Sequence, residues 1–221
     1  MTTKPKLTGV GFYTRSQAAA VLGVHPNKLR RWLGETASAD PVISRDCAVD
    51  GAITFTELME LMFIRQFRNE GVSMPAIRKA ATAAARKFRS AHPFATKRFD
   101  TDGKTIFATL QKKESDQTVI EDLAKGQFVF DEIIKPFFRK IEYGRQDAMR
   151  YWPLEMDGRV VLDPERRFGQ PIDSQTGIPT ATLANAVLVD PQHDVDSVAK
   201  WFGVSREAVT AALSFEKTLK P

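Results

Sequence analysis

The sequence has little of the chemistry that builds disulfide frameworks, metal centres or membrane spans. Its 221 residues include one cysteine, Cys47, and three scattered histidines, His25, His92 and His193. A lone cysteine excludes a disulfide framework, and these few residues lack the spacing of an ordinary zinc site. No apolar run approaches membrane-spanning length, and the first residues lack the apolar core of a signal peptide. We therefore expect a cytoplasmic protein with no metal and no membrane partner.

Patterns typical of enzymes are also scarce. The carboxylates between residues 100 and 132 have no metal-type spacing, no partner histidine nearby and no glycine-rich phosphate loop: Asp100, Asp102, Asp116, Glu121, Asp122, Asp131 and Glu132. Unpatterned acids of this kind fit turns and helix surfaces better than a catalytic centre. The sequence thus predicts a protein that is not an enzyme and that binds no cofactor.

What the sequence does have is an uneven distribution of charge. The formal net charge is +5, but residues 1–98 carry +9 and residues 99–221 carry −4. A basic half of this kind is typical of a nucleic-acid-binding unit, and a chance imbalance on a solvated surface is the alternative. With 43% hydrophobic residues, the chain is long enough for one or two globular domains.

Two segments, residues 17–33 and 197–213, share one helix-turn-helix pattern. In each, an alanine lies four residues before a glycine that permits the turn, and a valine follows. Only the first segment has a basic second helix, with cations for DNA phosphates and side chains that can form paired hydrogen bonds to base edges. Solvated helix charges are the alternative interpretation. The residues expected to contact DNA are Thr14, Arg15, His25, Asn27, Lys28, Arg30 and Arg31.

Hydrophobic spacing, capping residues and turn signals predict an α+β fold that is mostly helical. We expect helices over 14–22, 26–33, 56–71, 73–88, 130–141 and 180–189, then a helical pair around Gly203. The expected β-structure is a wing over 41–55 with a turn at Asp50-Gly51, a central β-hairpin over 97–110 and a strand over 159–163. This order predicts a winged helix-turn-helix unit (1–92), a central hairpin and helix segment (93–158) and a small helix-turn-helix-like unit (159–221).

The first part of the chain resembles the winged-helix DNA-binding domain of MerR-family transcriptional regulators. The resemblance covers roughly residues 11–90 and is carried by the runs 13–24, 29–33 and 55–78. It departs from the family pattern because the wing region lacks the usual Tyr-Arg element and no effector-binding cysteines are present. His92-Pro93 and the expected hairpin stand where the family has a long dimerising helix.

The last part, roughly residues 159–219, is similar to the small domain of VapB-like antitoxins that are fused to a MerR-like head. The similarity is carried by the runs 161–172, 176–180 and 198–209. It implies an antitoxin that neutralises a PIN-like ribonuclease toxin by direct binding and represses its own operon.

In that case Arg166, Arg167 and Lys217 would reach the acidic, metal-binding centre of the toxin. Alternatively, the two arginines pair with Glu165 or Asp163 within their own domain.

Two-fold symmetric half-sites in DNA further predict a homodimer, or a higher hetero-oligomer with the toxin. The edge of the expected hairpin is one candidate dimer seam. Two other functions stay open. One is a MerR-like transcriptional regulator without a toxin, whose C-terminal half serves oligomerisation or ligand sensing. The other is an adaptor whose basic helix binds RNA or an acidic protein.

Overall fold

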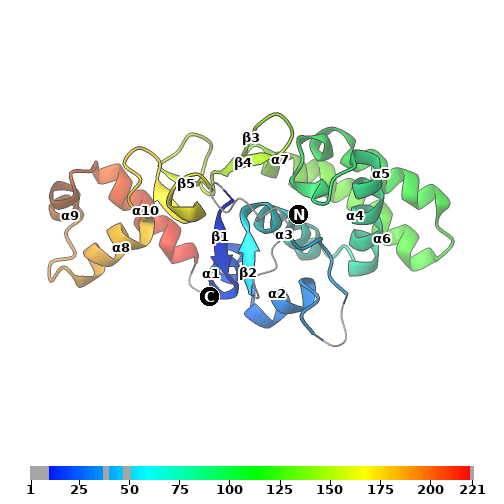
Figure 1. Cartoon of the computed structure of the whole chain (residues 1–221), viewed down its shortest axis with the longest axis horizontal. Helices are drawn as coiled ribbons and strands as arrows, with labels where there is room; N and C mark the ends of the chain where they lie inside the picture. The colour runs from blue at the N-terminus through cyan, green and yellow to red at the C-terminus, as the bar shows by residue number, and fades with distance from the viewer. Residues whose placement is uncertain (1–9, 37–39, 47–50, 220–221) are drawn as a thin grey trace, which may run out of the picture.

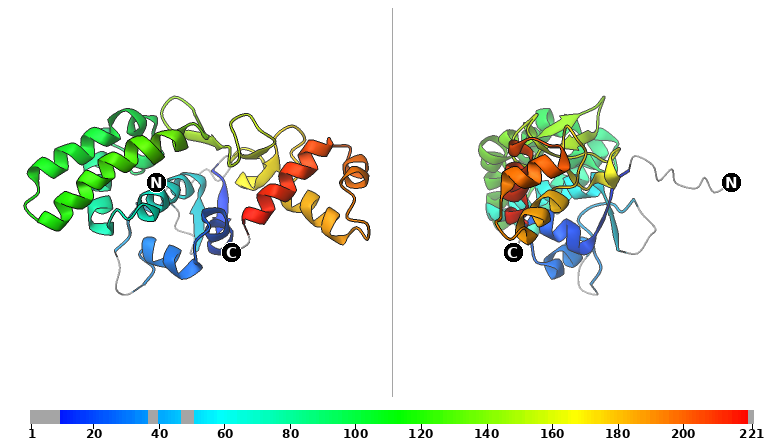
Figure 2. Two further views of the ribbon diagram at one scale, coloured as in Figure 1. Left: turned by 180° about the vertical axis from the view of Figure 1, so that it is seen from behind. Right: turned by 90° about the vertical axis from the view of Figure 1, so that its left-hand side faces the viewer.

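The computed structural model describes residues 10–36, 40–46 and 51–219, which form an elongated α+β fold (Figure 1). In chain order its elements are β1 (Phe12–Thr14), α1 (Arg15–Leu22), α2 (Pro26–Trp32), β2 (Ala52–Thr54), α3 (Phe55–Asn69), α4 (Met74–Phe88), the 3-10 turn η1 (Pro93–Ala95), α5 (Lys97–Lys113), α6 (Gln117–Val129), the π-turn η2 (Phe130–Ile134), α7 (Lys135–Phe138), β3 (Ile141–Tyr143), β4 (Ala148–Tyr151), β5 (Val160–Leu162), the 3-10 turn η3 (Arg167–Gly169), β6 (Pro171–Asp173), α8 (Thr180–Val189), α9 (Val195–Phe202) and α10 (Arg206–Thr218). Helices α4 to α6 lie at one end, α8 to α10 at the other, and the N-terminal elements lie between them (Figures 1 and 2).

Helices α1 and α2 form the first predicted helical pair. Thr14 Oγ1 accepts a hydrogen bond from the Gln17 N–H at 3.2 Å, and Gln17 Oε1 accepts one from the Thr14 N–H at 2.8 Å, so both ends of a capping box are made. Gly23 ends α1 at φ +56°, a conformation that glycine adopts without strain, and Pro26 begins α2. The prediction of these two helices is confirmed to within about a residue at each end.

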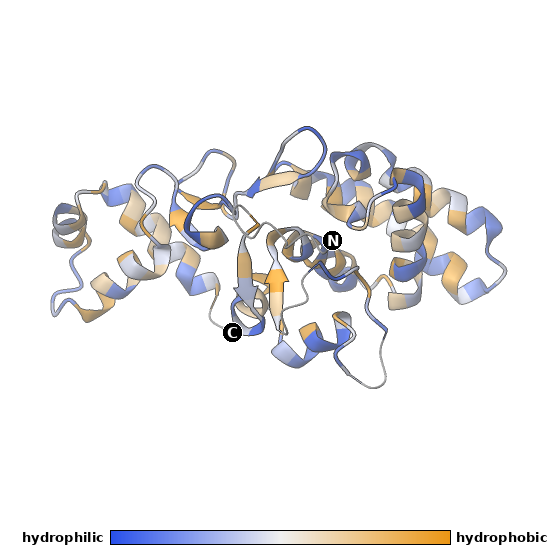
Figure 3. Ribbon diagram, in the orientation of Figure 1, coloured by the Kyte–Doolittle hydropathy of each residue, from blue (hydrophilic) through white to orange (hydrophobic). Residues whose placement is uncertain are grey.

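In the described residues, the strand expected in the wing does not pair within residues 41–55 as predicted. Strand β2 pairs antiparallel with β1, and this register places Tyr13 opposite Ile53, both buried against the core. Burial of that apolar pair explains why β2 pairs with the N-terminal strand. Residues 40–46 contain no strand, and Asp50 of the expected turn lies outside the described residues. Figure 3 shows β2 as an apolar strand in the centre of the molecule.

The predicted β-hairpin over 97–110 is wrong, because these residues form helix α5. The Asp102-Gly103 dipeptide is a strong turn signal, but it lies inside a helix whose buried residues Phe99, Gly103, Ile106 and Phe107 recur at helical spacing. At Gly103, helix α5 packs closely against Phe130. A Cβ at this position would lie 2.2 Å from Cε2 of Phe130. Close packing therefore explains the glycine, and the candidate dimer seam at a hairpin edge is lost with the hairpin.

Phenylalanine rings fill the core between α3, α5 and the η2 to α7 region. The Phe63 ring lies 5.0 Å from that of Phe137 at 88° and 4.9 Å from that of Phe138, and the Phe99 ring lies 4.7 Å from that of Phe94. Edge-to-face and tilted packing of buried rings stabilises such a core beyond the area that it buries. Of the predicted helix over 130–141, residues 130–134 form the π-turn η2 and residues 135–138 form α7, which contains Pro136.

A four-stranded antiparallel sheet in the order β3-β4-β5-β6 follows. The sequence predicts only β5 of these strands, and the sheet joins strands from both sides of the expected boundary at residue 158. Helix α8 spans 180–189 as predicted, and α9 and α10 form the second helical pair around Gly203, at φ +65°. Among the described residues, no helix is long and apolar enough to cross a membrane.

Candidate nucleic-acid interface

Helix α2 has one buried side and one basic, exposed side. Leu29 and Trp32 pack into the core, while Asn27, Arg30 and Arg31 are exposed at the three- and four-residue spacing that places side chains on one helix face. Within the described residues, the side chains of Arg30 and Arg31 form no ion pair or hydrogen bond. Two guanidinium groups on a protruding helix can therefore reach a ligand at no cost to the fold.

The other predicted contacts on α2 are exposed but have local structural roles. His25 is the N-cap residue, and its Nδ1 accepts a hydrogen bond from the Asn27 N–H at 3.2 Å. Lys28 Nζ lies 5.2 Å from the centre of the Trp32 ring, a cation–π distance. The His25 ring and the Lys28 ammonium therefore lie at the exposed surface beside the two arginines, with geometry fixed by the helix itself.

The two predicted contacts at the start of α1 already have partners inside the chain. Thr14 is exposed, and its hydroxyl caps α1. Arg15 is half-buried, and its Nε lies 2.6 Å from Oε2 of Glu35. The residues expected to contact DNA thus fall into two groups. Those on α2 include the exposed cations Arg30 and Arg31, whereas Thr14 and Arg15 have side chains that stabilise the fold.

A buried charge network that the sequence analysis missed holds residues 40–46 against α3. Arg45 Nε lies 3.0 Å from Oε1 of Glu57 and its Nη1 lies 3.2 Å from Oε1 of Glu35, while Nη2 donates to the Ala52 carbonyl at 2.8 Å. Glu57 is fully buried and is also the capping-box partner of Thr54. Glu35 thus links Arg15 of α1 to Arg45, so the network fixes how α1 and the segment beside it are placed.

His92 continues this network on the other side of residue 46. Its Nδ1 lies 3.0 Å from Oε2 of buried Glu60, and its Nε2 lies 2.7 Å from Oδ1 of Asp46. Burial lowers the pKa of His92, but hydrogen bonds and charge from Glu60 and Asp46 outweigh burial and raise it to about 9. Burial raises the pKa of Glu60 above its ordinary value, and hydrogen bonds from His92 and from the Phe94 N–H, which donates to Oε1 at 3.0 Å, only partly offset this effect. We assign an ion pair between His92 and Glu60 at neutral pH.

The three residues predicted to contact a toxin lie in different settings. Arg166 is half-buried and its Nη1 donates to the Ser174 carbonyl at 2.7 Å, rather than pairing with Glu165 or Asp163. Asp163 instead binds Arg150 at 2.9 Å. Arg167 is exposed on η3, and Lys217 is exposed in the last turn of α10. Arg167 and Lys217 are therefore free to bind a partner, whereas Arg166 supports its own loop.

The loop that presents Arg167 is strained. Arg167, Phe168 and Gly169 have φ of +49°, +56° and +82°, and the Phe168 side chain is 70% exposed. Two consecutive left-handed residues other than glycine are costly, so the surrounding structure must hold them. Tyr13 does so, because its hydroxyl donates to the Gly169 carbonyl at 2.6 Å.

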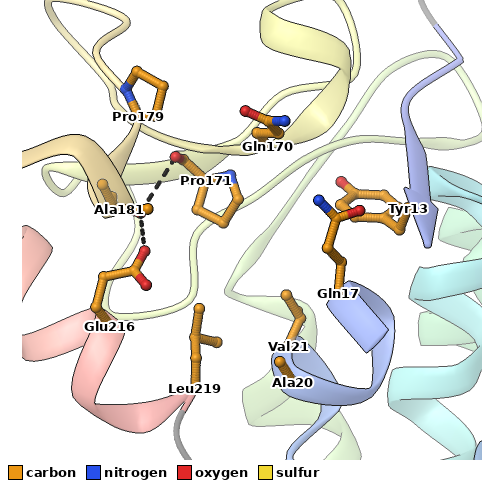
Figure 4. Close-up of a pocket in the computed structure, with 11 residues that line it drawn as sticks. Tyr13, Gln17, Ala20, Val21, Gln170, Pro171, Pro179, Ala181, Glu216 and Leu219 are labelled. Carbon is orange, nitrogen blue, oxygen red and sulfur yellow. Dashed lines mark hydrogen bonds between the residues drawn. The ribbon is translucent and has the colours of Figure 1, made fainter. Parts of the chain in front are cut away.

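A cavity of about 260 Å³ separates α1 from α10 and the start of α8. Gln17 and Val21 of α1 face Glu216 of α10 and Leu219, the residue that follows α10, across it (Figure 4). The Thr180 hydroxyl donates to Glu216 Oε1 at 2.5 Å, and Pro171 closes one side. Its apolar lining with a few polar groups is typical of small-molecule sites. Within the described ranges, no group of three or more His, Cys, Asp or Glu side chains could hold a metal ion.

No family model matches this chain. Comparison with curated proteins finds similarity to "Putative antitoxin VapB45" of Mycobacterium tuberculosis, 24% identical over 225 residues that cover 92% of this chain and 93% of that protein. The crystal structure of Rv2018 from Mycobacterium tuberculosis has a similar fold, with a TM-score of 0.76 and 23% identity over 93% of this chain and 98% of that one. Both matches run along most of each chain, so the likeness concerns the whole arrangement and not the α1–α2 pair alone.

Proposed function

We propose that this protein is the DNA-binding antitoxin of a toxin-antitoxin module. It binds operator DNA through α2 and holds a cognate toxin in an inhibited complex, without catalysing a reaction itself. The observation that carries the DNA-binding half is a pair of exposed guanidinium groups on α2, Arg30 and Arg31, which have no side-chain partner in the described part of the chain. The antitoxin half is supported by similarity along most of the chain to a protein that is named an antitoxin.

In this proposal α1, α2 and the β1–β2 pair act as a MerR-like winged helix-turn-helix. Arg30 and Arg31 contact phosphates and guanine edges in the major groove, with Asn27 and His25 beside them. Lys28 is close to the Trp32 ring and serves as a phosphate contact. Because one short helix reads only a few base pairs, the operator complex contains a dimer of the chain.

A titration of labelled duplex DNA tests the first half. The duplex comes from upstream of the protein's own reading frame, and a shuffled duplex of equal composition serves as the comparison. We expect Arg31→Ala to weaken binding to the upstream duplex by about 1–3 kcal/mol and to reduce the preference over the shuffled one. Arg86→Ala is the matched control, because Arg86 is also an exposed cation, in the last turn of α4. Equal affinity of wild type and Arg31→Ala contradicts the assignment.

The toxin in this proposal is a PIN-like ribonuclease whose acidic, metal-binding centre attracts the free cations Arg167 and Lys217. The test measures ribonuclease activity of the purified neighbouring gene product with increasing amounts of this chain. We expect an Arg167→Ala, Lys217→Ala double variant to inhibit more weakly than wild type while it keeps the wild-type circular dichroism spectrum. Arg166 is left intact because it donates to the Ser174 carbonyl. Full inhibition by the double variant contradicts these contacts.

One observation favours a second candidate function, a transcriptional regulator that senses a small molecule and has no toxin. The cavity lies directly behind α1, so a bound molecule would touch both the DNA-binding pair and α10. A harmless neighbouring gene product, together with sequence-specific DNA binding, would favour this candidate over the antitoxin.

A further inference from the structure

Helix α6 exposes a phenylalanine on the side that does not pack against the molecule. The Phe128 side chain is 69% exposed, whereas most phenylalanines of this chain are buried. The other side of α6 is tightly packed, because Leu123 and Val129 lie in the core and a Cβ at Gly126 would lie 2.6 Å from Cδ1 of Phe107. Large apolar side chains are normally buried for most of their area. Phe128 is therefore available to a surface outside the chain.

Two oppositely charged residues flank Phe128 on the same side. Lys125 lies three residues before it and Glu132 lies four residues after it, the spacing that places side chains on one helix face. Glu132 belongs to η2, which follows α6 directly, and all three side chains are exposed. In the part of the chain that the structure describes, neither the Lys125 ammonium nor the Glu132 carboxylate forms an ion pair or hydrogen bond. We call Lys125, Phe128 and Glu132 the α6 face.

The order of charges on the α6 face makes it complementary to itself. When a second copy of the helix packs antiparallel against the first, Lys125 of each copy lies beside Glu132 of the other, and the two Phe128 rings meet between these pairs. Parallel packing would instead bring like charges together. An interface with two-fold symmetry requires one patch that is complementary to itself, and charged pairs set the direction in which helices associate. A second copy of this chain therefore matches the α6 face in one orientation.

The next turn of the helix in each direction repeats this order. Glu121 lies seven residues before Phe128 and Lys135 lies seven residues after it, so the antiparallel arrangement also brings these opposite charges together. Each has a contact in its own chain, because Glu121 Oε1 accepts from the Gln117 amide at 3.0 Å and Lys135 Nζ lies 3.2 Å from Asp131 Oδ1. Exposed contacts of this kind are weak. The inner charges, Lys125 and Glu132, carry the argument, and the outer ones agree with it.

We infer that this chain forms a two-fold symmetric dimer through the α6 face, with Phe128 at its centre and two ion pairs between Lys125 and Glu132 across it. This face takes the place of the lost hairpin edge as the dimer seam. It lies at the end of the molecule opposite α8 to α10, so the C-terminal unit stays accessible in the dimer (Figures 1 and 2). The dimer forms without DNA or toxin and is therefore independent of the proposed function, although it supplies the dimer that operator binding requires.

Sedimentation velocity of the full chain without DNA tests the role of Phe128. Wild type should show a monomer–dimer equilibrium. Phe128→Ala should raise the Kd of the dimer by about tenfold or more, because it removes an aromatic contact at the centre of the interface from both copies. Trp201→Ala is the matched control, because Trp201 is 80% exposed on α9, and it should leave the Kd unchanged. Both variants should keep the wild-type circular dichroism spectrum.

Charge exchange tests the two-fold arrangement. Lys125→Glu and Glu132→Lys should each raise the Kd by about tenfold, because both cross pairs become repulsive. The double variant that carries both substitutions restores opposite charges and should dimerise as wild type does. Lys125 and Glu132 of one copy lie about 10 Å apart along the helix, too far to pair with each other, so this recovery reports contacts between copies. A mixture of the two single variants should form a heterodimer.

Several results would overturn the inference. A wild-type chain that stays monomeric up to about 100 μM excludes the dimer, and it leaves the proposed function standing if the chain still binds DNA or a toxin. A dimer that Phe128→Ala and both charge reversals leave unchanged uses another surface. A double variant that does not recover, or single variants that form no heterodimer, exclude the antiparallel pairing. A monomeric wild type that binds another protein through Phe128 shows a different occupant.

Discussion

The ion pair of His92 with Glu60 predicts how the stability of the fold depends on pH. The pKa of His92 is raised to about 9 in the fold, against about 6.5 in an unfolded chain. A group whose pKa is raised on folding stabilises the fold fully below its unfolded pKa, and that contribution is lost as the pH rises through the folded value. The rise in the pKa of His92 from about 6.5 to about 9 corresponds to about 3 kcal/mol of stabilisation. This stabilisation is present at pH 6 and gone by about pH 10.

Urea unfolding of wild type and His92→Gln at a series of pH values between 6 and 10 measures this contribution. Subtracting the two free energies of unfolding at each pH cancels every titration that the proteins share. We expect the advantage of wild type over His92→Gln to shrink by about 3 kcal/mol across this range. His92→Gln should also be less stable at pH 6, because it leaves the buried carboxylate of Glu60 without its cation. A difference that stays constant with pH, or that grows as the pH rises, contradicts the ion pair.

Two further predictions concern backbone positions. Gly103→Ala should destabilise the protein by about 1–3 kcal/mol in urea unfolding, because the added methyl group would lie 2.2 Å from the Phe130 ring. Thr101→Ala, at an exposed position of the same helix, is its control, and equal losses would contradict the packing argument. Phe168→Gly should raise the free energy of unfolding by about 1 kcal/mol, because glycine relieves the strain of a residue at φ +56° whose side chain is exposed. A loss of stability instead would show that the Phe168 ring contributes to the fold.

Local signals predicted most of the helices of this fold. Thr14, Thr54 and Ser73 each accept a hydrogen bond from the backbone N–H three residues later, and each stands where the sequence indicates a helix start. Such caps depend only on neighbouring residues, so they can be found without knowledge of the tertiary structure. The same holds for Gly23 and Gly203, which end their helices in the left-handed conformation.

Non-local pairing explains the errors. Asp102-Gly103 has the composition of a hairpin turn, but the partner of Gly103 is Phe130, 27 positions away. Strand β2 pairs with β1 across the whole α1–α2 pair, and β6 pairs with β5 across η3. Each of these short strands is specified by its partner more than by its own residues.

The sequence names candidate contact residues, but it does not show which of their side chains the fold itself uses. Sequence alone cannot distinguish a free cation such as Arg31 from Arg15, which is paired with Glu35, or from Arg166, which is bound to the Ser174 carbonyl. The sequence does contain a signal for the buried charge network around Arg45 and His92. Glu57 and Glu60 are acids within an apolar helical run, and buried carboxylates require partners.

Growth of cells that express the neighbouring reading frame, with and without this chain, tests the proposed antitoxin most directly. The account predicts that the neighbouring product alone arrests growth and that co-expression of this chain restores it. A neighbouring product that does not arrest growth, or an arrest that persists although this chain is present in folded form, contradicts the account.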